Sequence, residues 1–71
     1  MEAKRISEAE ALFECVYRVR EHFIGYPGKA VVWFETPNLI LGGASPLQLI
    51  RAGHAKKLRD VIDNLLSGNI A

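Results

Sequence analysis

Cysteine, charge of one sign and long apolar runs are all scarce in this sequence, and each shortage excludes a class of protein. With Cys15 as the only cysteine, no internal disulfide can form, and we expect a cytoplasmic setting. The net charge of +1 is too small to attract nucleic acid or another polyanion by itself. No apolar run reaches the ~18 residues of a membrane helix, so we expect a soluble protein without a membrane partner.

What the sequence does contain is a high proportion of apolar side chains in a short chain. Hydrophobic residues make up 49% of its 71 residues, which predicts one folded domain over residues 1–71. A domain of this size buries only ~60% of the surface that its unfolded chain exposes, so a partner subunit is an expected source of stability. The patterns described below predict an all-α bundle of about four helices.

The first helix is predicted over about residues 7–24, because Ser7 and Glu10 have the spacing of a capping box. Its apolar arc is roughly 200° wide, whereas ~100° is enough for an amphipathic helix to contact its own core. The centre of the arc is formed by Leu12, Val16, Val19 and Phe23. We expect the additional flank to contact a second copy of the chain. The predicted dimer contacts are Phe13, Tyr17, Arg20 and Ile24.

The opposite side of this helix is charged, and we expect it to face solvent. Glu14 and Arg18 stand four residues apart, in the order that favours an ion pair along a helix. Arg59 and Asp63 have the same spacing near the end of the chain, and we expect them to pair in the same way.

Residues 29–35 are apolar on every side, a pattern that fits both a buried strand and a buried helix. Periodicity alone leaves both alternatives open. We prefer a short buried helix with Pro27 near its first turn, because no other segment offers a strand with which this one could pair.

Two further helices are predicted after residue 44. Ser45 directly before Pro46 is a typical helix start, and Gly53 ends that helix. The last helix is predicted over about residues 54–67, with Gly68 at its C-terminal cap. Its apolar side is formed by Leu58, Val61, Ile62, Leu65 and Leu66.

A search for catalytic or metal-binding residues finds little. Cys15 and His22 lie about two helical turns, ~10 Å, apart, so they form neither a nucleophile pair nor half of a zinc site. Cys15 is therefore expected to fill the core. The adjacent Gly42 and Gly43 lack the Lys and Ser/Thr of a phosphate-binding loop and are expected to make a tight turn. We expect a binding protein and not an enzyme, with no cofactor and no metal.

A cluster of basic residues around Gly53 supports an alternative function, a small helical DNA-binding regulator. The cluster comprises Arg51, Lys56, Lys57 and Arg59. Asp60 and Asp63 on the same helix dilute its charge, so a solvated helix face is the preferred interpretation. A dimerisation module without a further partner is another alternative.

Residues 33–47 read WFETPNLILGGASPL, and this ordered string resembles the signature of the toxin-binding domain of Xre/MbcA/ParS-type antitoxins. The positions that match in identity or kind are Trp33, Pro37, Asn38, Leu41, Gly42, Gly43, Pro46, Leu47, Leu49 and Ile50. We expect structural roles for the residues of this signature and its helix cap, namely Trp33, Pro37, Asn38, Gly42, Gly43, Ser45, Pro46 and Leu47. The resemblance spans residues 26–71. It departs from the family at Leu39 and Ile40, where the family usually has Pro and Ala.

The resemblance implies a bacterial type II toxin–antitoxin system in which this domain binds a RES-type, NAD-consuming toxin and occludes its active site. The family's last residues approach the toxin's cleft. The predicted partner-binding residues are Leu39, Ile40, Leu41, Arg59, Asn69, Ile70 and Ala71. The helix-turn-helix domain that usually precedes the toxin-binding domain is not found in the residues before Tyr26. This leaves three alternatives, namely a stand-alone toxin-binding protein, a fragment, and a relative of the family put to another use. Nucleic-acid binding through this chain alone is not expected.

Overall fold

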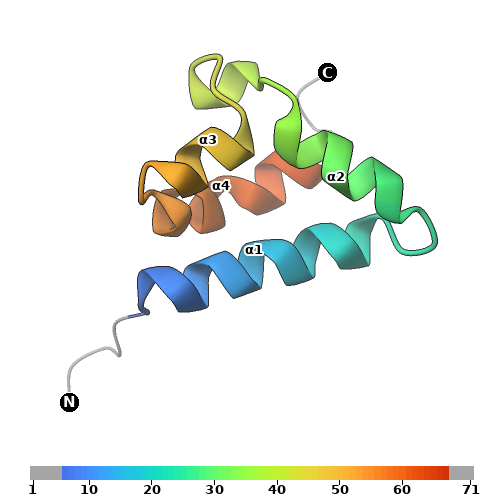
Figure 1. The fold of residues 1–71 in the computed structure, drawn as a ribbon, viewed down its shortest axis with the longest axis horizontal. Helices are drawn as coiled ribbons and strands as arrows, with labels where there is room; N and C mark the ends of the chain where they lie inside the picture. The colour runs from blue at the N-terminus through green and yellow to red at the C-terminus, as the bar shows by residue number, and fades with distance from the viewer. Residues whose placement is uncertain (1–5, 68–71) are drawn as a thin grey trace.

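Helices account for most of the computed structural model, which describes residues 6–67. Four α-helices, α1 (Glu8–His22), α2 (Pro27–Glu35), α3 (Pro46–Arg51) and α4 (Ala55–Ser67), are joined by short turns, with a 3-10 helix, η1 (Leu39–Leu41), between α2 and α3. In Figure 1, α1 runs along one side of the bundle, α2 and α3 lie on the other, and α4 passes behind them. The all-α class is confirmed, and residues 6–67 contain no strand.

Capping boxes start both α1 and α3. The box at Ser7 and the helix start at Ser45 are confirmed, whereas the part that Gln48 plays in the second box was not predicted. The Ser7 hydroxyl accepts from the Glu10 N–H at 3.0 Å, and the Glu10 carboxylate accepts from the Ser7 N–H at 2.9 Å. Ser45 and Gln48 repeat the arrangement at 3.1 and 2.8 Å, with Pro46 at the first position of α3. Each box satisfies two backbone N–H groups that a helix start leaves unpaired, so both starts are encoded locally.

Residues 29–35, for which the sequence allowed either a strand or a helix, belong to a helix. Pro27 occupies the first turn of α2, where its missing N–H costs nothing, and the helix continues to Glu35. A strand here would have left its backbone groups unpaired, because the described chain supplies no second strand. The predicted start of α4 is also confirmed to within one residue, whereas the Gly68 cap lies outside the described residues.

The core lies mainly between α1 and α4. The buried hydrophobic residues are Ala11, Cys15, Val19, Ala30, Ala55, Leu58 and Ile62. The expectation that Leu12 and Val16 form the centre of the buried stripe is wrong, because both are only half-buried and the buried face of α1 is turned toward Ala11 and Cys15. Small side chains on that face let α4 approach closely, and the Cys15 thiol donates to the Ala55 carbonyl at 3.7 Å.

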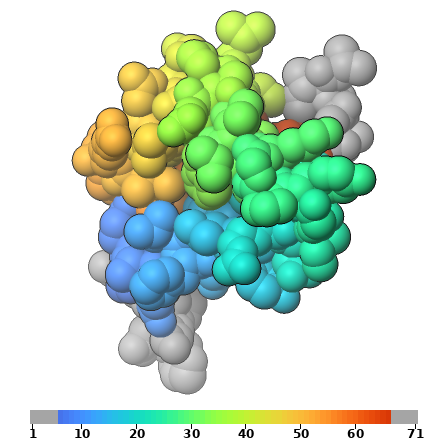
Figure 2. Space-filling view, turned by 45° about the vertical axis from the view of Figure 1, so that its right-hand side comes forward, coloured from blue at the N-terminus to red at the C-terminus, as the bar shows by residue number. Residues whose placement is uncertain are grey.

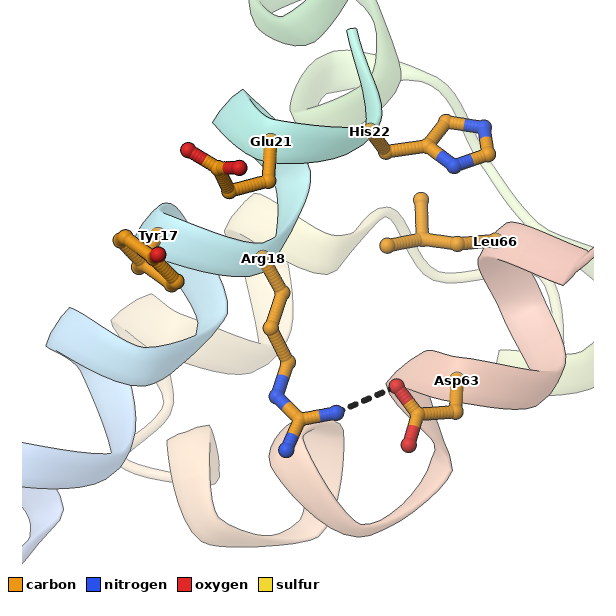
Figure 3. A pocket seen from close by; sticks show the side chains of 6 residues that line it. All are labelled: Tyr17, Arg18, Glu21, His22, Asp63 and Leu66. Carbon is orange, nitrogen blue, oxygen red and sulfur yellow. Dashed lines mark hydrogen bonds and ion pairs between the residues drawn. The ribbon is translucent and has the colours of Figure 1, made fainter. Parts of the chain in front are cut away.

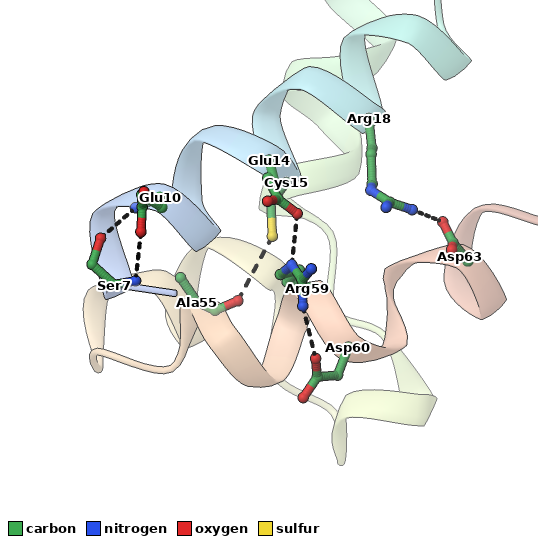
Figure 4. A network of polar contacts seen from close by, with 9 residues as sticks. All are labelled: Ser7, Glu10, Glu14, Cys15, Arg18, Ala55, Arg59, Asp60 and Asp63. Carbon is green, nitrogen blue, oxygen red and sulfur yellow. Dashed lines mark hydrogen bonds and ion pairs between the residues drawn. The ribbon is translucent and has the colours of Figure 1, made fainter. Parts of the chain in front are cut away.

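Charged side chains join α1 to α4 along the edge of this core (Figure 4). Glu14 accepts from Arg59 Nε at 2.6 Å, and Arg18 forms an ion pair with Asp63. The predicted pairs within each helix, Glu14 with Arg18 and Arg59 with Asp63, are therefore wrong. The reason is geometric: once α1 and α4 lie side by side, an oppositely charged partner on the other helix is in reach of each side chain.

Glu8 makes another link between the same helices. Its carboxylate accepts hydrogen bonds from the backbone N–H groups of Ala55 and Lys56, the latter at 3.4 Å. The negative charge lies at the N-terminus of α4, where unpaired N–H groups and the helix dipole favour it. A residue of the first helix thus caps the last. None of the helices within residues 6–67 has the length and apolarity needed to cross a membrane.

Candidate protein-binding surface

Large hydrophobic side chains are more common on the surface of this structure than in its core. The exposed ones within residues 6–67 are Phe13, Tyr17, Ile24, Tyr26, Val31, Val32, Leu39 and Ile40. Within the same residues, the fully buried aliphatic side chains of comparable size are Val19, Leu58 and Ile62, and eight further large hydrophobic side chains are half-buried against them. Scattered apolar residues on a surface are ordinary, but contiguous apolar surface marks a site of interaction. The arrangement of these residues therefore decides their meaning.

The outer face of α1 brings together the four predicted dimer contacts, Phe13, Tyr17, Arg20 and Ile24. At 100° per residue their directions fall within about 60° of one another, nearly opposite the buried face of the helix. Phe13 is 69% exposed and Ile24 is 72% exposed. We name these four residues the outer stripe. Their exposure makes them available for contact, and dimerisation through them stays a prediction.

A groove of about 480 Å³ borders the outer stripe, between the C-terminal half of α1 and α2. In Figure 2 these two segments, cyan and green, lie next to each other on the face toward the viewer. The groove is lined by Val16, Arg20, Phe23, Ile24, Gly25, Pro27, Ala30, Val31 and Phe34. Arg20 is its only charged lining residue. The expectation that α2 is buried is wrong for Val31 and Val32, which are exposed. A helix that is apolar on every side must expose part of its apolar surface when it covers only one face of a core.

A second hollow, of about 470 Å³, lies between α1 and α4 (Figure 3). Its lining residues are Tyr17, Arg18, Glu21, His22, Asp63 and Leu66. Arg18 bonds Asp63 across its floor, and Figure 3 shows Glu21 and His22 directed away from that pair and from each other. No Ser, Thr or Cys lines the hollow. Across residues 6–67, no group of three or more His, Cys, Asp or Glu side chains could hold a metal ion.

Cys15, the one nucleophilic sulfur in the chain, is fully buried. Desolvation raises the pKa of its thiol to about 11, and the nearby Glu14 carboxylate adds to the rise. A neutral, inaccessible thiol is a poor nucleophile and a poor metal ligand. The expectation that Cys15 fills the core is confirmed.

The turn after α2 presents the predicted partner contacts Leu39 and Ile40 at the tip of the molecule. Asn38 holds this turn through its side-chain oxygen, which accepts from the Ile40 N–H at 2.9 Å. Leu39 is 93% exposed and Ile40 43% exposed, whereas Leu41 is half-buried and packs against the core. We name Leu39 and Ile40 the apolar tip. Its backbone is held in place while its side chains remain uncovered.

Two glycines close the turn behind the apolar tip. Gly42 and Gly43 have φ angles of +72° and +90°, in the left-handed region that side chains disfavour. A Cβ atom would meet nothing within 4 Å at either position, so the backbone conformation and not a lack of space requires glycine. The tight turn predicted for this pair is confirmed. Trp33 and Phe34 of α2 are half-buried against the core, with their rings edge to face at 5.2 Å.

The other predicted partner contacts do not join the apolar tip. Arg59 lies on α4 against α1, bonded to Glu14 and, at 3.5 Å, to Asp60. Asn69, Ile70 and Ala71 lie outside the described residues. Arg59 is thus committed to acidic partners, which also weakens the basic cluster around Gly53. In addition, the Glu8 carboxylate occupies the N-terminus of α4, the end of a helix that would otherwise attract a phosphate.

Comparison with known protein families identifies this arrangement. Residues 9–68 match the family model of the antitoxin Xre/MbcA/ParS C-terminal toxin-binding domain. The chain belongs to this family. The match begins in α1, so the toxin-binding domain includes the first helix as well as the segment from residue 26 that resembles the signature. Comparisons with curated proteins and with solved structures found no match.

Membership in the family explains why the described surface is rich in apolar contacts and poor in catalytic groups. The family is a toxin-binding domain of antitoxins, and its task is to contact another protein. Two separate surfaces of this antitoxin domain are suited to contact, namely the outer stripe with its groove and the apolar tip.

Proposed function

We propose that this antitoxin domain neutralises a RES-type, NAD-consuming toxin in the bacterial cytoplasm by binding it and occluding its active site. The proposal rests on the match of residues 9–68 to the toxin-binding domain. In this proposal the apolar tip is an anchor for the toxin, and the antitoxin acts as a homodimer through the outer stripe. Its contribution to inhibition is steric and non-covalent.

The apolar tip has the properties of a binding anchor. Leu39 is almost fully exposed, so contact with a partner would remove most of its apolar surface from water. The backbone beneath it is held by hydrogen bonds from the Leu41 and Gly43 N–H groups to the Asn38 carbonyl, both at 3.0 Å. A turn that is ordered before binding loses little conformational entropy on binding, which strengthens the interaction.

The C-terminal residues Asn69, Ile70 and Ala71 supply the occluding part of the proposal. In the sequence they come after Gly68, which follows the last residue of α4, and the family resemblance assigns the corresponding residues to the toxin's cleft. We propose that the tip contributes affinity and that these last residues block access of NAD. Binding and inhibition then depend on different parts of the antitoxin.

Co-purification with a RES-type protein encoded beside this chain tests the proposal. We expect one complex in size-exclusion chromatography and loss of NAD consumption by the toxin. Leu39→Glu should weaken the complex at least tenfold, whereas Leu39→Met, which keeps an apolar side chain of similar size, should retain it. Absence of a complex with the unmodified antitoxin would refute the pairing.

A truncated antitoxin separates binding from inhibition. Removal of residues 69–71 should leave the complex intact and restore NAD consumption by the bound toxin. Full inhibition by the truncated protein would reject occlusion by these residues and leave toxin binding unaffected.

A further inference from the structure

The outer stripe has the same spacing when it is read in either direction along α1. Its positions, 13, 17, 20 and 24, are separated by four, three and four residues. This alternation is typical of a seam between two packed helices. If two copies of α1 lie antiparallel about a two-fold axis between residues 18 and 19, Phe13 meets Ile24 of the partner subunit and Tyr17 meets Arg20 of the partner subunit. A parallel pairing would place the two Arg20 side chains in the same layer.

Arg20 is the one charged residue of the stripe, and its guanidinium has no partner within residues 6–67. Its side chain forms no hydrogen bond, ion pair or ring contact there, although it lines a groove that is otherwise apolar. The antiparallel register gives the guanidinium a partner in Tyr17 of the partner subunit, because a guanidinium is attracted to the face of a tyrosine ring. Both copies gain this contact, since each residue pair across a two-fold axis occurs twice.

The groove beside the stripe fits the remaining pair. Ile24 lines the groove together with Val31 and Phe34. Phe13 is 69% exposed on the same face of α1 and does not line the groove of its own chain. When Phe13 faces Ile24 of the partner subunit, its ring stands at the mouth of the partner's groove.

We infer that two copies of this antitoxin pack antiparallel through α1, with Phe13 of each copy in the α1–α2 groove of the other and Arg20 of each over Tyr17 of the other. The inference rests on the homodimer in the proposed function and adds its geometry. We choose a second copy as the occupant because one chain carries both halves of each contact. Phe13 and the α1–α2 groove form one such contact, and Arg20 and the Tyr17 ring form the other. The apolar tip remains free for the toxin.

Disulfide cross-linking of the full chain tests the register. A disulfide requires Cα atoms within about 7 Å, whereas the antiparallel register separates the two copies of residue 13 by ~16 Å along the helix axis. We expect a mixture of Phe13→Cys and Ile24→Cys chains to form a mixed disulfide, and neither variant alone to cross-link. Cys15 is fully buried, so the unmodified chain serves as an uncross-linked control.

Sedimentation of Arg20 variants supplies a second measurement. Arg20→Glu should weaken self-association at least tenfold, whereas Arg20→Lys, which keeps the cation, should stay within about threefold. Circular dichroism of both variants should match that of the unmodified chain, because Arg20 is exposed and unpaired.

Any other outcome overturns the inference and shows whether the antiparallel register or the homodimer itself is wrong. Cross-linking of each single variant with itself indicates a parallel dimer, which refutes the register alone. A monomer in sedimentation refutes the homodimer as well. If that monomer loses the toxin complex on Arg20→Glu, the outer stripe contacts the toxin and not a second copy. In every case the toxin complex itself is measured separately, so the antitoxin role stands or falls on its own test.

Discussion

The two faces of α1 are both apolar, yet they differ in the size of their side chains and in what covers them. The inner face carries Ala11, Cys15 and Val19, which α4 buries completely. The outer face carries Phe13, Tyr17 and Ile24, which are all more than 60% exposed. Burial of a large apolar side chain stabilises a fold or a complex by about 1.5–3 kcal/mol. The side chains of the outer face contribute little of this free energy while they remain exposed. The inner face of α1 thus carries smaller side chains than the outer face, whose large apolar side chains remain uncovered in the described structure.

The largest difference in the free energy of unfolding should appear when the same substitution, Leu→Ala, is made at a buried and at an exposed position. Leu58→Ala in the fully buried position of α4 should lower the free energy of unfolding by about 2–5 kcal/mol. Leu39→Ala at the apolar tip should change it by less than about 0.5 kcal/mol, because a side chain that is already exposed leaves no cavity. Urea denaturation followed by circular dichroism measures both. Equal losses would contradict the assignment of the core.

The pH dependence of stability tests the burial of the inner face. Folding raises the pKa of Cys15 from 9.0 to about 11, so between these values the folded state holds a proton that the unfolded state releases. The contribution of Cys15 to stability is therefore fully present below pH 9 and is lost as pH rises toward 11, by about 2–3 kcal/mol at 1.36 kcal/mol per pH unit. Denaturation at several pH values measures the slope. Cys15→Ala is the control and should show a flatter dependence, and an equal slope in both proteins would refute the prediction.

Concentration dependence of unfolding tests the outer face. If a second copy covers the outer stripe, each tenfold increase in protein concentration above the dissociation constant stabilises the folded state by about 1.4 kcal/mol per mole of dimer, or about 0.7 kcal/mol per chain. Thermal unfolding of the unmodified chain should then shift upward with concentration, and that of Phe13→Glu should not. Leu39→Glu, an equally drastic change at the apolar tip, should behave as the unmodified chain does. A shift that survives Phe13→Glu would exclude the outer stripe as the dimer contact.

The smallest expected effect concerns Glu8, whose carboxylate lies at the N-terminus of α4. Glu8→Gln weakens the charge that caps α4 and should cost about 1 kcal/mol of unfolding free energy. Glu21→Gln on the exposed side of α1 removes the same charge and should cost less than about 0.3 kcal/mol. Thermal or chemical denaturation of the two variants in parallel gives the comparison. Equal effects would show that Glu8 stabilises only its own helix.

Local patterns predicted the helices well because the signals that start and end them act over three or four residues. The Ser7–Glu10 and Ser45–Gln48 boxes, Pro27 at the start of α2 and the glycines of the turn after η1 all form contacts with near neighbours in the chain. The apolar string around the tip also carried the family resemblance, which the match over residues 9–68 confirms.

Predictions from sequence patterns were wrong where a contact joins distant parts of the chain. The apolar arc of α1 is wide enough to contain two faces, and its centre at Leu12 and Val16 turned out to lie between them. The partners of Glu14 and Arg18 lie on α4, 45 residues away in each case, and outweigh the neighbours that helical spacing offered. Glu8 caps a helix that begins 47 residues later.

The sequence by itself therefore determined the elements of this protein: all-α structure, the starts of its helices, the glycine turn and the family to which the apolar string points. These features depend on hydrogen bonds and backbone angles within a few residues. Only the tertiary structure decided which face of α1 is inside, which charges pair and which apolar residues remain uncovered. Those choices depend on how closely α4 can approach α1, and the small side chains of Ala11, Cys15 and Ala55 act on that approach only once the chain has folded.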